Sequence, residues 1–278
     1  MTSRTGGNEP TDPRSELNEF LRTRRARLRP EDVGVTAYGR RRRVPGLRRE
    51  ELAQLAGVSV AYYTRLEQGN GQNVSAEVLG AIAGALRLTP SERAHLFHLA
   101  RPAPAGAPTQ PQQVRPELVE LLDSMVGVPA YVWGRRGDVL AWNVAATTIF
   151  GRWFERPAEQ RNWTRIVFLD PAARDYFLDW ENKAAEVVHQ LRMDAGRHPH
   201  DPLVAALVTE ALEQSPDFRR MWATHDVRQF SRGSLRVRHD DLGLMHFRYE
   251  TLTLPDDPEQ AVTIYRAVPE PDGGAPRG

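Results

Sequence analysis

Residues 47–69 read LRREELAQLAGVSVAYYTRLEQG, and this stretch decides the fold of the N-terminal part of the chain. Apolar residues recur at helical spacing on both sides of Gly57, which predicts two short helices joined by a tight turn. Glycine tolerates the positive φ that such a turn needs, and Ala53 is small enough for the two helices to touch there. Three apolar residues are expected beneath the second helix: Val58, Tyr63 and Leu66. The stretch therefore predicts a helix-turn-helix.

Charge supplies the functional side of the argument, because any hairpin of two helices would share this spacing. Residues 20–49 contain 11 arginines and two acidic residues, although the whole chain of 278 residues carries a net charge of only +1. Such a local excess of arginine is typical of a surface that binds a polyanion, and a solvated charged face is the alternative. Next to a helix-turn-helix, the arginines indicate that the polyanion is double-stranded DNA.

The second helix, expected at residues 59–68, turns outward the side chains that the core does not need. Arg65 is the expected base-reading residue, because arginine bonds bidentately to guanine O6 and N7; a surface ion pair is its alternative. Apolar side chains on the same face can contact thymine methyl groups, and the arginines before this helix can contact phosphates and set the salt dependence. The expected DNA-binding residues are Arg40, Arg41, Arg42, Arg43, Arg48, Arg49, Ser59, Val60, Ala61, Tyr62, Thr64 and Arg65.

The chain divides around a stretch rich in Pro, Ala and Gln at residues 101–113, which reads as a semi-rigid linker. An all-helical domain is expected before it, at residues 15–100, and a second domain after it, at residues 114–270. The polar, Gly- and Pro-rich ends, residues 1–14 and 271–278, are expected to be disordered tails. Within the first domain we expect helices near residues 17–28, 47–56, 59–68, 76–86 and 89–99, with Ser59 as a helix N-cap.

The second domain differs in composition, because 17 of the 22 aromatic residues and all six tryptophans follow the linker. It is expected to hold a large aromatic core and mixed secondary structure. The pattern predicts a β-hairpin at residues 129–142, a helix opened by Asn143, a long helical region at residues 163–228 broken at 196–199, and strands at 234–238, 244–254 and 261–268. Two strands, a helical insert and three strands are the order of a PAS-like sensor.

These motifs resemble two known families. Residues 45–53 (PGLRREELA) and 62–69 (YYTRLEQG) resemble an actinobacterial branch of the Xre, or lambda-repressor-like, helix-turn-helix regulators. After the linker, segments such as residues 129–132 (PAYV), 141–143 (AWN) and 168–174 (FLDPAAR) resemble the MmyB-like ligand-binding domain that follows this branch. The resemblance implies a multidomain fold, α plus mixed α/β, with an all-α helix-turn-helix domain followed by an α+β PAS-like sensor domain.

The first resemblance also implies roles for single residues. The helix at residues 59–68 would be the recognition helix, entering the major groove by its N-terminal end. Arg49 stands where the family often has a glutamine, and it suits a phosphate better than a base. Glu67 would pair with Arg25 of the first helix, which is a structural role. The sequence departs from the MmyB-like pattern at residues 238–241 (RHDD), where members often show His-Pro.

The second resemblance implies a sensor that holds a small, lipid-like apolar molecule. Eight aromatic residues are candidates to line its cavity, with His225 and Arg228 as polar partners of a carboxylated ligand. A solid aromatic core is the alternative, and it would make the domain a dimerisation or interaction module without a ligand; helix capping or an internal ion pair is the alternative for His225 and Arg228. The aromatic candidates are Trp133, Trp142, Phe150, Phe168, Trp222, Phe247, Tyr249 and Tyr265.

Several classes of protein are not expected. The chain has no cysteine, no apolar run of the roughly 18–20 residues that a membrane span needs, and no hydrophobic signal core, so we expect a soluble, cytoplasmic protein. Residues 198–201 (HPHD) are expected to form a turn rather than a metal site, and no motif for catalysis or for haem, flavin or nucleotide cofactors occurs. The expected partners are operator DNA, a small apolar or acyl ligand, and a second copy in a homodimer; no enzyme activity, metal, cofactor or membrane is expected.

Overall fold

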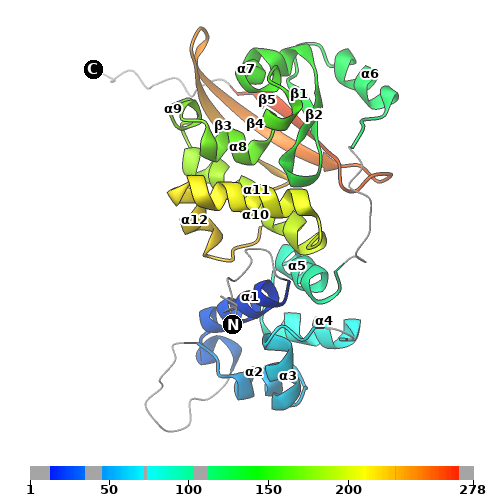
Figure 1. Ribbon diagram of the computed structural model, residues 1–278, viewed down its shortest axis with the longest axis vertical. Coiled ribbons are helices and arrows are strands. Elements are labelled where there is room, and N and C mark those ends of the chain that lie inside the picture. The colour runs from blue at the N-terminus through cyan, green and yellow to red at the C-terminus, as the bar shows by residue number, and fades with distance from the viewer. Residues whose placement is uncertain (1–12, 35–45, 72–73, 103–111, 229, 269–278) are drawn as a thin grey trace, which may run out of the picture. The chain divides into compact units, whose positions relative to one another are not determined.

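A computed structural model describes residues 13–34, 46–71, 74–102, 112–228 and 230–268 of the chain (Figure 1). The expected phosphate contacts Arg40, Arg41, Arg42 and Arg43, most of the linker and most of the two tails lie outside the described residues. The chain forms two compact units. The first comprises Met1–Pro108, Arg192–Thr209 and Arg220–Arg228, and the second comprises Thr109–Leu191, Glu210–Arg219 and Gln229–Gly278.

The first unit contains the predicted helices. Ser59 caps the second helix of the helix-turn-helix, because its Oγ accepts a hydrogen bond from the Tyr62 N–H at 3.1 Å. Gly57 has φ 66°, as the predicted turn requires. The helices run α1 (Pro13–Arg27), α2 (Arg49–Leu55), α3 (Val60–Glu67), α4 (Ala76–Ala85) and α5 (Pro90–Ala100), with a 3-10 turn at Pro30–Val33. The short helices predicted from local signals are thus confirmed.

The core of the first unit is mainly aliphatic. Phe20, Leu52 and Tyr63 are fully buried, and Ala53 is buried where α2 and α3 touch. Residues from the far side of the linker complete this core, since Val227 is buried in it and Met193 packs against it. The sequence shows no sign of this contribution, because it joins residues that lie more than a hundred positions apart.

The second unit is built on a five-stranded antiparallel sheet of order β2-β1-β5-β4-β3 (Figure 1). This mixed α+β arrangement confirms the predicted PAS-like class. Alternation along the strands gives the sheet two different faces. On one face, α6 (Pro116–Ser124) buries Leu118 and Leu122 against β1 and β5. On the other, Tyr131 meets Phe150 and Trp163, which follow the hairpin in the chain. The strands are β1 (Ala130–Trp133), β2 (Val139–Trp142), β3 (Arg232–His239), β4 (Gly243–Thr253) and β5 (Ala261–Ala267).

Between β2 and β3 the chain is helical. Asn143 caps α7 as predicted, since its Oδ1 accepts from the Ala146 N–H at 3.0 Å. The expectation of helix as far as Arg228 is wrong: α12 ends at Trp222, and His225 takes φ 51°, outside the helical range. The helices are α7 (Val144–Phe154), α8 (Trp163–Leu169), α9 (Ala172–Tyr176), α10 (Trp180–Arg197), α11 (Pro202–Gln214) and α12 (Pro216–Trp222), with a 3-10 turn at Ala158–Gln160.

Candidate functional site

The outer face of α3 is small and accessible. Its inner residues, Tyr63, Leu66 and Glu67, are buried, so the remaining positions of the helix face away from the core. Of the residues predicted to contact DNA, Ser59, Val60, Ala61 and Arg65 are exposed, Tyr62 and Thr64 are half-buried, and Arg48 and Arg49 are exposed at the start of α2. The structure thus brings the described members of the predicted set onto α3 and the beginning of α2.

Two of these arginines differ in what they touch. Arg49 is committed to Glu67, with Nε 3.1 Å from a carboxylate oxygen. The Arg65 guanidinium instead lies 6.0 Å from the centre of the Tyr62 ring, and among the described residues it pairs with no acid. The Arg48 guanidinium likewise pairs with no acidic side chain within the described part of the chain. Arg48 and Arg65 therefore keep their charge available, while the ion pair with Glu67 uses part of that of Arg49.

Glu67 connects α3 to two other helices, α1 and α2. The carboxylate is only 1% exposed and accepts from Arg25 Nη2 at 2.7 Å, which confirms the pair that the resemblance implied. Arg25 Nη1 also donates to the Leu47 carbonyl at 2.7 Å. Burial raises the pKa of the Tyr63 phenol, and the nearby Glu67 carboxylate adds to the rise, so the phenol stays neutral. The buried Glu67 carboxylate of α3 is thus bonded to Arg25 of α1 and to the exposed Arg49 of α2, and these two ion pairs hold the recognition helix.

The start of α1 touches the end of α3. Gly69 has φ 86°, and a Cβ at this position would lie 2.5 Å from the Arg14 carbonyl oxygen. Only glycine fits such a close approach between two backbones. The backbone at the start of α1 is therefore in direct contact with the chain just after the recognition helix.

A second cluster of buried charge lies at the start of α1. The Arg192 guanidinium is fully buried, donates to Glu16 and to the Trp222 carbonyl, and stacks 4.0 Å from the Trp222 ring centre. His225 Nδ1 lies 3.1 Å from Arg192 Nη1 and 3.2 Å from a Glu16 carboxylate oxygen. Burial by itself would raise the pKa of Glu16, but Arg192 and His225 outweigh it and hold that pKa at about 2. Glu16 is therefore a carboxylate at any physiological pH.

Two of the predicted ligand residues belong to this cluster, and a third lies near it in the sequence. Trp222 and His225 belong to it, in the first unit, where His225 meets a carboxylate and a guanidinium of the protein itself. Arg228 is exposed. Trp222 and His225 thus contact charged groups of the protein itself, Arg192 and Glu16.

A buried histidine neighbours the cluster. His95 of α5 is fully buried, its ring lies edge-on to Phe20 with centroids 5.1 Å apart, and neither ring nitrogen finds a hydrogen-bond partner among the described residues. Burial lowers the pKa of His95 to about 3, so the ring is neutral. Gly196 of α10 leaves room for it, because a Cβ there would lie 2.7 Å from His95 Cε1.

In the second unit, four of the predicted aromatic residues form one group. Tyr265 has ring centroids 5.4 Å from Phe150, 6.0 Å from Phe247 and 5.6 Å from Tyr249. Tyr131, which the sequence analysis did not single out, stacks on Tyr265 at 6.0 Å with its hydroxyl 3.4 Å from that of Tyr265. This group lies on the face of the sheet that α7 and α8 cover.

Of the other predicted aromatic residues in this unit, Phe168 lies apart from the group. It packs edge-on to Phe218, with centroids 5.1 Å apart, and to Trp180. Trp142 adjoins the group, because it packs against Phe154, whose ring lies 5.2 Å from Tyr131 and 5.1 Å from Phe150. Trp133 Nε1 donates at 3.0 Å to Thr263 Oγ1, on the β5 residue that pairs with Tyr131.

The polar centre of the aromatic group is a residue that sequence reasoning missed. Lys183 is the single lysine of the chain and is buried on α10, with Nζ 4.2 Å from the centre of the Trp163 ring and 3.1 Å from a Glu186 carboxylate oxygen. Glu186 also accepts from the Tyr249 hydroxyl. Burial acts to lower the pKa of Lys183, but Glu186 and Tyr131 raise it above its ordinary value, so the amine carries a charge. One lysine among 37 basic residues, followed three positions later by an acid, was the available signal.

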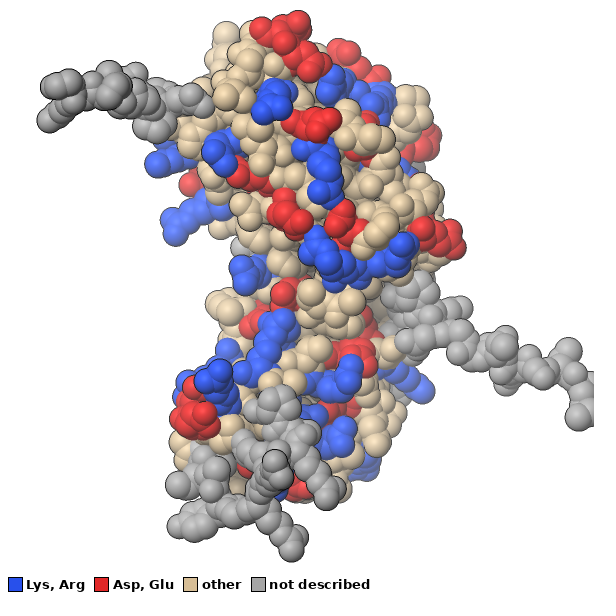
Figure 2. Space-filling view, turned by 90° about the vertical axis from the view of Figure 1, so that its left-hand side faces the viewer, with Lys and Arg blue, Asp and Glu red and all other residues tan. Residues whose placement is uncertain are grey.

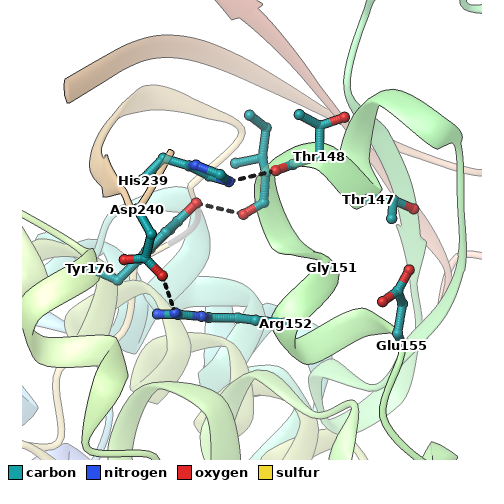
Figure 3. Close-up of a pocket in the computed structure, with 9 residues that line it drawn as sticks. Thr147, Thr148, Gly151, Arg152, Glu155, Tyr176, His239 and Asp240 are labelled. Atoms are coloured by element: carbon teal, nitrogen blue, oxygen red, sulfur yellow. Dashed lines mark hydrogen bonds and ion pairs between the residues drawn. The ribbon is translucent and has the colours of Figure 1, made fainter. Parts of the chain in front are cut away.

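A shallow pocket of about 230 Å³ opens between α7 and the β3–β4 turn (Figure 3). Its polar groups largely satisfy one another. His239 Nδ1 accepts from the Asp241 N–H at 3.1 Å, so Nε2 carries the proton and donates to the Thr148 carbonyl at 2.9 Å. Arg152 pairs with Asp240. The turn lies where the sequence departs from the MmyB-like pattern. Two residues of this turn, His239 and Asp240, bond it to α7.

Within the described part of the chain, no group of three or more His, Asp or Glu side chains is arranged to hold a metal ion. On the face shown in Figure 2, basic and acidic side chains are interspersed rather than gathered into fields of one sign. No helix of the described residues is long and apolar enough to cross a membrane.

Comparisons with known proteins match both parts of the chain. The model of the MmyB-like transcription regulator ligand binding domain matches residues 114–275, which is more than half of the sequence. A helix-turn-helix domain model matches residues 16–96. No curated protein matches the sequence.

Proposed function

The chain belongs to the MmyB-like transcription regulators and carries a helix-turn-helix domain, and from this we propose that it binds operator DNA sequence-specifically and senses a small apolar ligand of acyl type. The outer face of α3 carries the DNA-binding part of the proposal. It is accessible and bears an arginine without an acidic partner among the described residues, while Tyr63, Leu66 and Glu67 are buried on the inner side of the helix.

In this proposal the contacts divide by chemistry. Arg65 reads guanine from the exposed face of α3, with Val60 and Ala61 against thymine methyl groups. Ser59, Tyr62 and Thr64 flank them on the same helix. Arg48 and Arg49, together with Arg40–Arg43, which lie outside the described residues, contact phosphates and set the salt dependence.

We further propose that two copies bind one operator. A single α3 reads one half-site, and the helix-turn-helix geometry places two half-sites about 34 Å apart along the duplex. The protein would act in the cytoplasm, where its DNA is. We assign residues 15–100 to the DNA-binding domain and 114–270 to the ligand-binding domain, and we propose no catalytic role for either.

For the ligand we propose a place on the face of the sheet that α7 and α8 cover. Phe150, Phe247 and Tyr265 provide apolar walls there, and Lys183 and Tyr249 provide polar groups at one point of them. Ligand sites combine mostly apolar walls with a few polar groups that fix orientation. One observation favours the competing function, an interaction module without ligand: the rings of this group already pack against one another.

The DNA-binding proposal is tested by selecting duplexes from a random pool with the purified full-length protein. Enrichment of a sequence with two related half-sites is expected. Arg65→Ala should then discriminate less between the selected duplex and a scrambled one, whereas Arg248→Ala, a control at an exposed site of β4, should discriminate as the wild type does. Enrichment of no sequence would contradict sequence-specific binding.

The ligand proposal is tested by native mass spectrometry before and after denaturing extraction. A dimer that releases an acyl-type compound supports sensing. A dimer of clean mass, with no compound in the extract, favours the interaction module.

A further inference from the structure

One helix takes part in both compact units. Of α10, Trp180–Leu191 belongs to the second unit and Arg192–Arg197 to the first. Lys183 and Glu186 lie in its first part, at the polar centre of the aromatic group, and Arg192 opens its second part. Lys183 and Arg192 are about two and a half turns apart, because an α-helix has 3.6 residues per turn. One continuous helix therefore carries residues of the proposed ligand site and the arginine that bonds Glu16.

The Arg192 end of this helix is held unusually firmly. The fully buried guanidinium bonds Glu16 and the Trp222 carbonyl, and its charge has little access to water. Breaking one partner of a buried pair leaves the other charge unpaired, which is strongly unfavourable. A movement of α10 therefore either carries Glu16 with it or breaks this contact at high cost.

The same cluster has two hydrogen-bond arrangements. His225 Nδ1 is within reach of both Arg192 and Glu16, but it either accepts from the guanidinium or donates to the carboxylate. His225 also has φ 51°, which is uncommon for a residue with a side chain, and Arg24 Nη2 holds its carbonyl at 2.5 Å. A strained residue with two alternative partners is suited to an element with two states.

From Glu16 the path to DNA is short. Glu16 lies two residues after Arg14, whose carbonyl abuts Gly69 directly beyond α3. Further along the same helix, Arg25 bonds Glu67, the last residue of α3. Both ends of α1 thus bear on the C-terminal end of the recognition helix.

We propose that α10 transmits the state of the ligand-binding domain to the recognition helix, with Arg192–Glu16 as the coupling pair. This inference rests on the proposed function, since it names the regulation of that same site. Arg192 and Glu16 are positioning residues: they touch neither DNA nor ligand, and they act through α1 on α3. Coupling requires an element with two arrangements that both sites can bias, and we assign this role to α10 with the Arg192–Glu16–His225 cluster.

The test is a double-mutant cycle on the full-length protein and needs no ligand. Glu186→Gln removes the charge that pairs with Lys183, and Glu16→Gln removes the charge that pairs with Arg192 without changing shape. The affinity for the selected duplex is measured for the wild type, both single variants and the double variant. Hydrogen exchange of the α3 amides is measured on the same four proteins without DNA. Arg192→Lys replaces Glu16→Gln if the latter does not fold, and Asp179→Asn, in an exposed pair with Arg236, is the control for Glu186→Gln.

Coupling predicts that Glu186→Gln changes duplex affinity about 5-fold or more in the wild-type background and less than about 2-fold in the Glu16→Gln background. The change in α3 exchange should disappear in the same way, and Asp179→Asn should change neither. An equal effect of Glu186→Gln in both backgrounds, or none in the wild type, overturns the proposal. If the wild type selects no duplex, the proposed function fails, but the exchange cycle still decides whether α10 and α3 are coupled.

Discussion

The two units are held together by different means. In the first, buried charges join the helices: Arg25 and Arg49 meet at Glu67, and Arg192 meets Glu16. In the second, aromatic rings fill the space between sheet and helices, and Lys183 is the charge at their centre. Rings tolerate small rearrangements, whereas a buried ion pair tolerates few, because each partner needs the other. Charged contacts thus fix α3 in the first unit, whereas packed rings form the core of the second.

The largest effect is expected where this contrast is sharpest, at Glu67. Glu67→Ala leaves Arg25 half-paired in a buried site and should lower the free energy of unfolding of the first unit by about 3–5 kcal/mol. Thermal unfolding followed by circular dichroism measures this. Glu67→Gln, which keeps the shape and an acceptor, should lose less. Equal losses for the two variants would mean that volume, and not charge, holds α3.

The matching test in the second unit removes a ring. Tyr265→Ala deletes a buried side chain that contacts three predicted aromatic residues, and a loss of about 3–5 kcal/mol is expected from the cavity. Tyr265→Phe should be close to neutral, because the ring remains and its hydroxyl makes only a long contact of 3.4 Å with Tyr131. A large loss for Tyr265→Phe would show that hydrogen bonding also holds this core. Urea unfolding measures both.

The free energy of unfolding of the first unit is expected to depend on pH through its buried histidine, His95. His95 has a pKa of about 3 in the folded state against 6.5 in the unfolded chain, so only the unfolded state takes up the proton between these values. Stability is therefore complete above pH 6.5 and falls by up to about 1.4 kcal/mol for each pH unit below it. Glu16 has a pKa of about 2 in the folded state against 4.5 in the unfolded chain, so it adds to this loss of stability only below pH 4.5.

Between pH 6.5 and 4.5 Glu16 adds nothing to this decline, whereas His95 and the partly buried His98, whose pKa burial also lowers, both contribute to it. His95→Leu should flatten the decline in that window, and urea unfolding at a series of pH values measures it. The exposed His200→Leu serves as the control and should leave the slope as it is in the wild type. An unchanged slope for His95→Leu would contradict the neutral, buried ring.

The contrast also explains what the sequence could predict. The ends of α2 and α3, the Ser59 cap and the positive φ of Gly57 follow from residues within a few positions of one another, and they were predicted closely. Arg25–Glu67 came from a family resemblance. Arg192–Glu16 joins residues 176 positions apart, and no local pattern marks it. The position of Lys183 under Trp163 likewise depends on how helices pack on the sheet, so the aromatic group was predicted in part and its charged centre was missed.

A smaller effect is expected on the surface of α3, where no buried group is disturbed. Arg65→Ala should cost about 1–3 kcal/mol on the selected duplex and much less on a scrambled one, because a bidentate contact to guanine is lost. Arg48→Ala should weaken both duplexes alike and reduce the salt slope by about one. Fluorescence anisotropy at several salt concentrations measures these losses. Parallel losses on both duplexes for Arg65→Ala would assign this residue to phosphate.

The smallest effect is expected for the exposed counterpart of the buried pairs. Arg236 of β3 bonds Asp179 at 2.5 and 2.7 Å, a geometry as good as that of Arg25–Glu67, but the Arg236 side chain is 52% exposed. Solvent screens such a pair, and Asp179→Ala should cost no more than about 1 kcal/mol, falling further in 1 M salt. If Asp179→Ala costs as much as Glu67→Ala in parallel urea titrations, burial does not set the worth of these ion pairs. The division between a charge-fixed first unit and a ring-filled second unit would then have to rest on the rings alone.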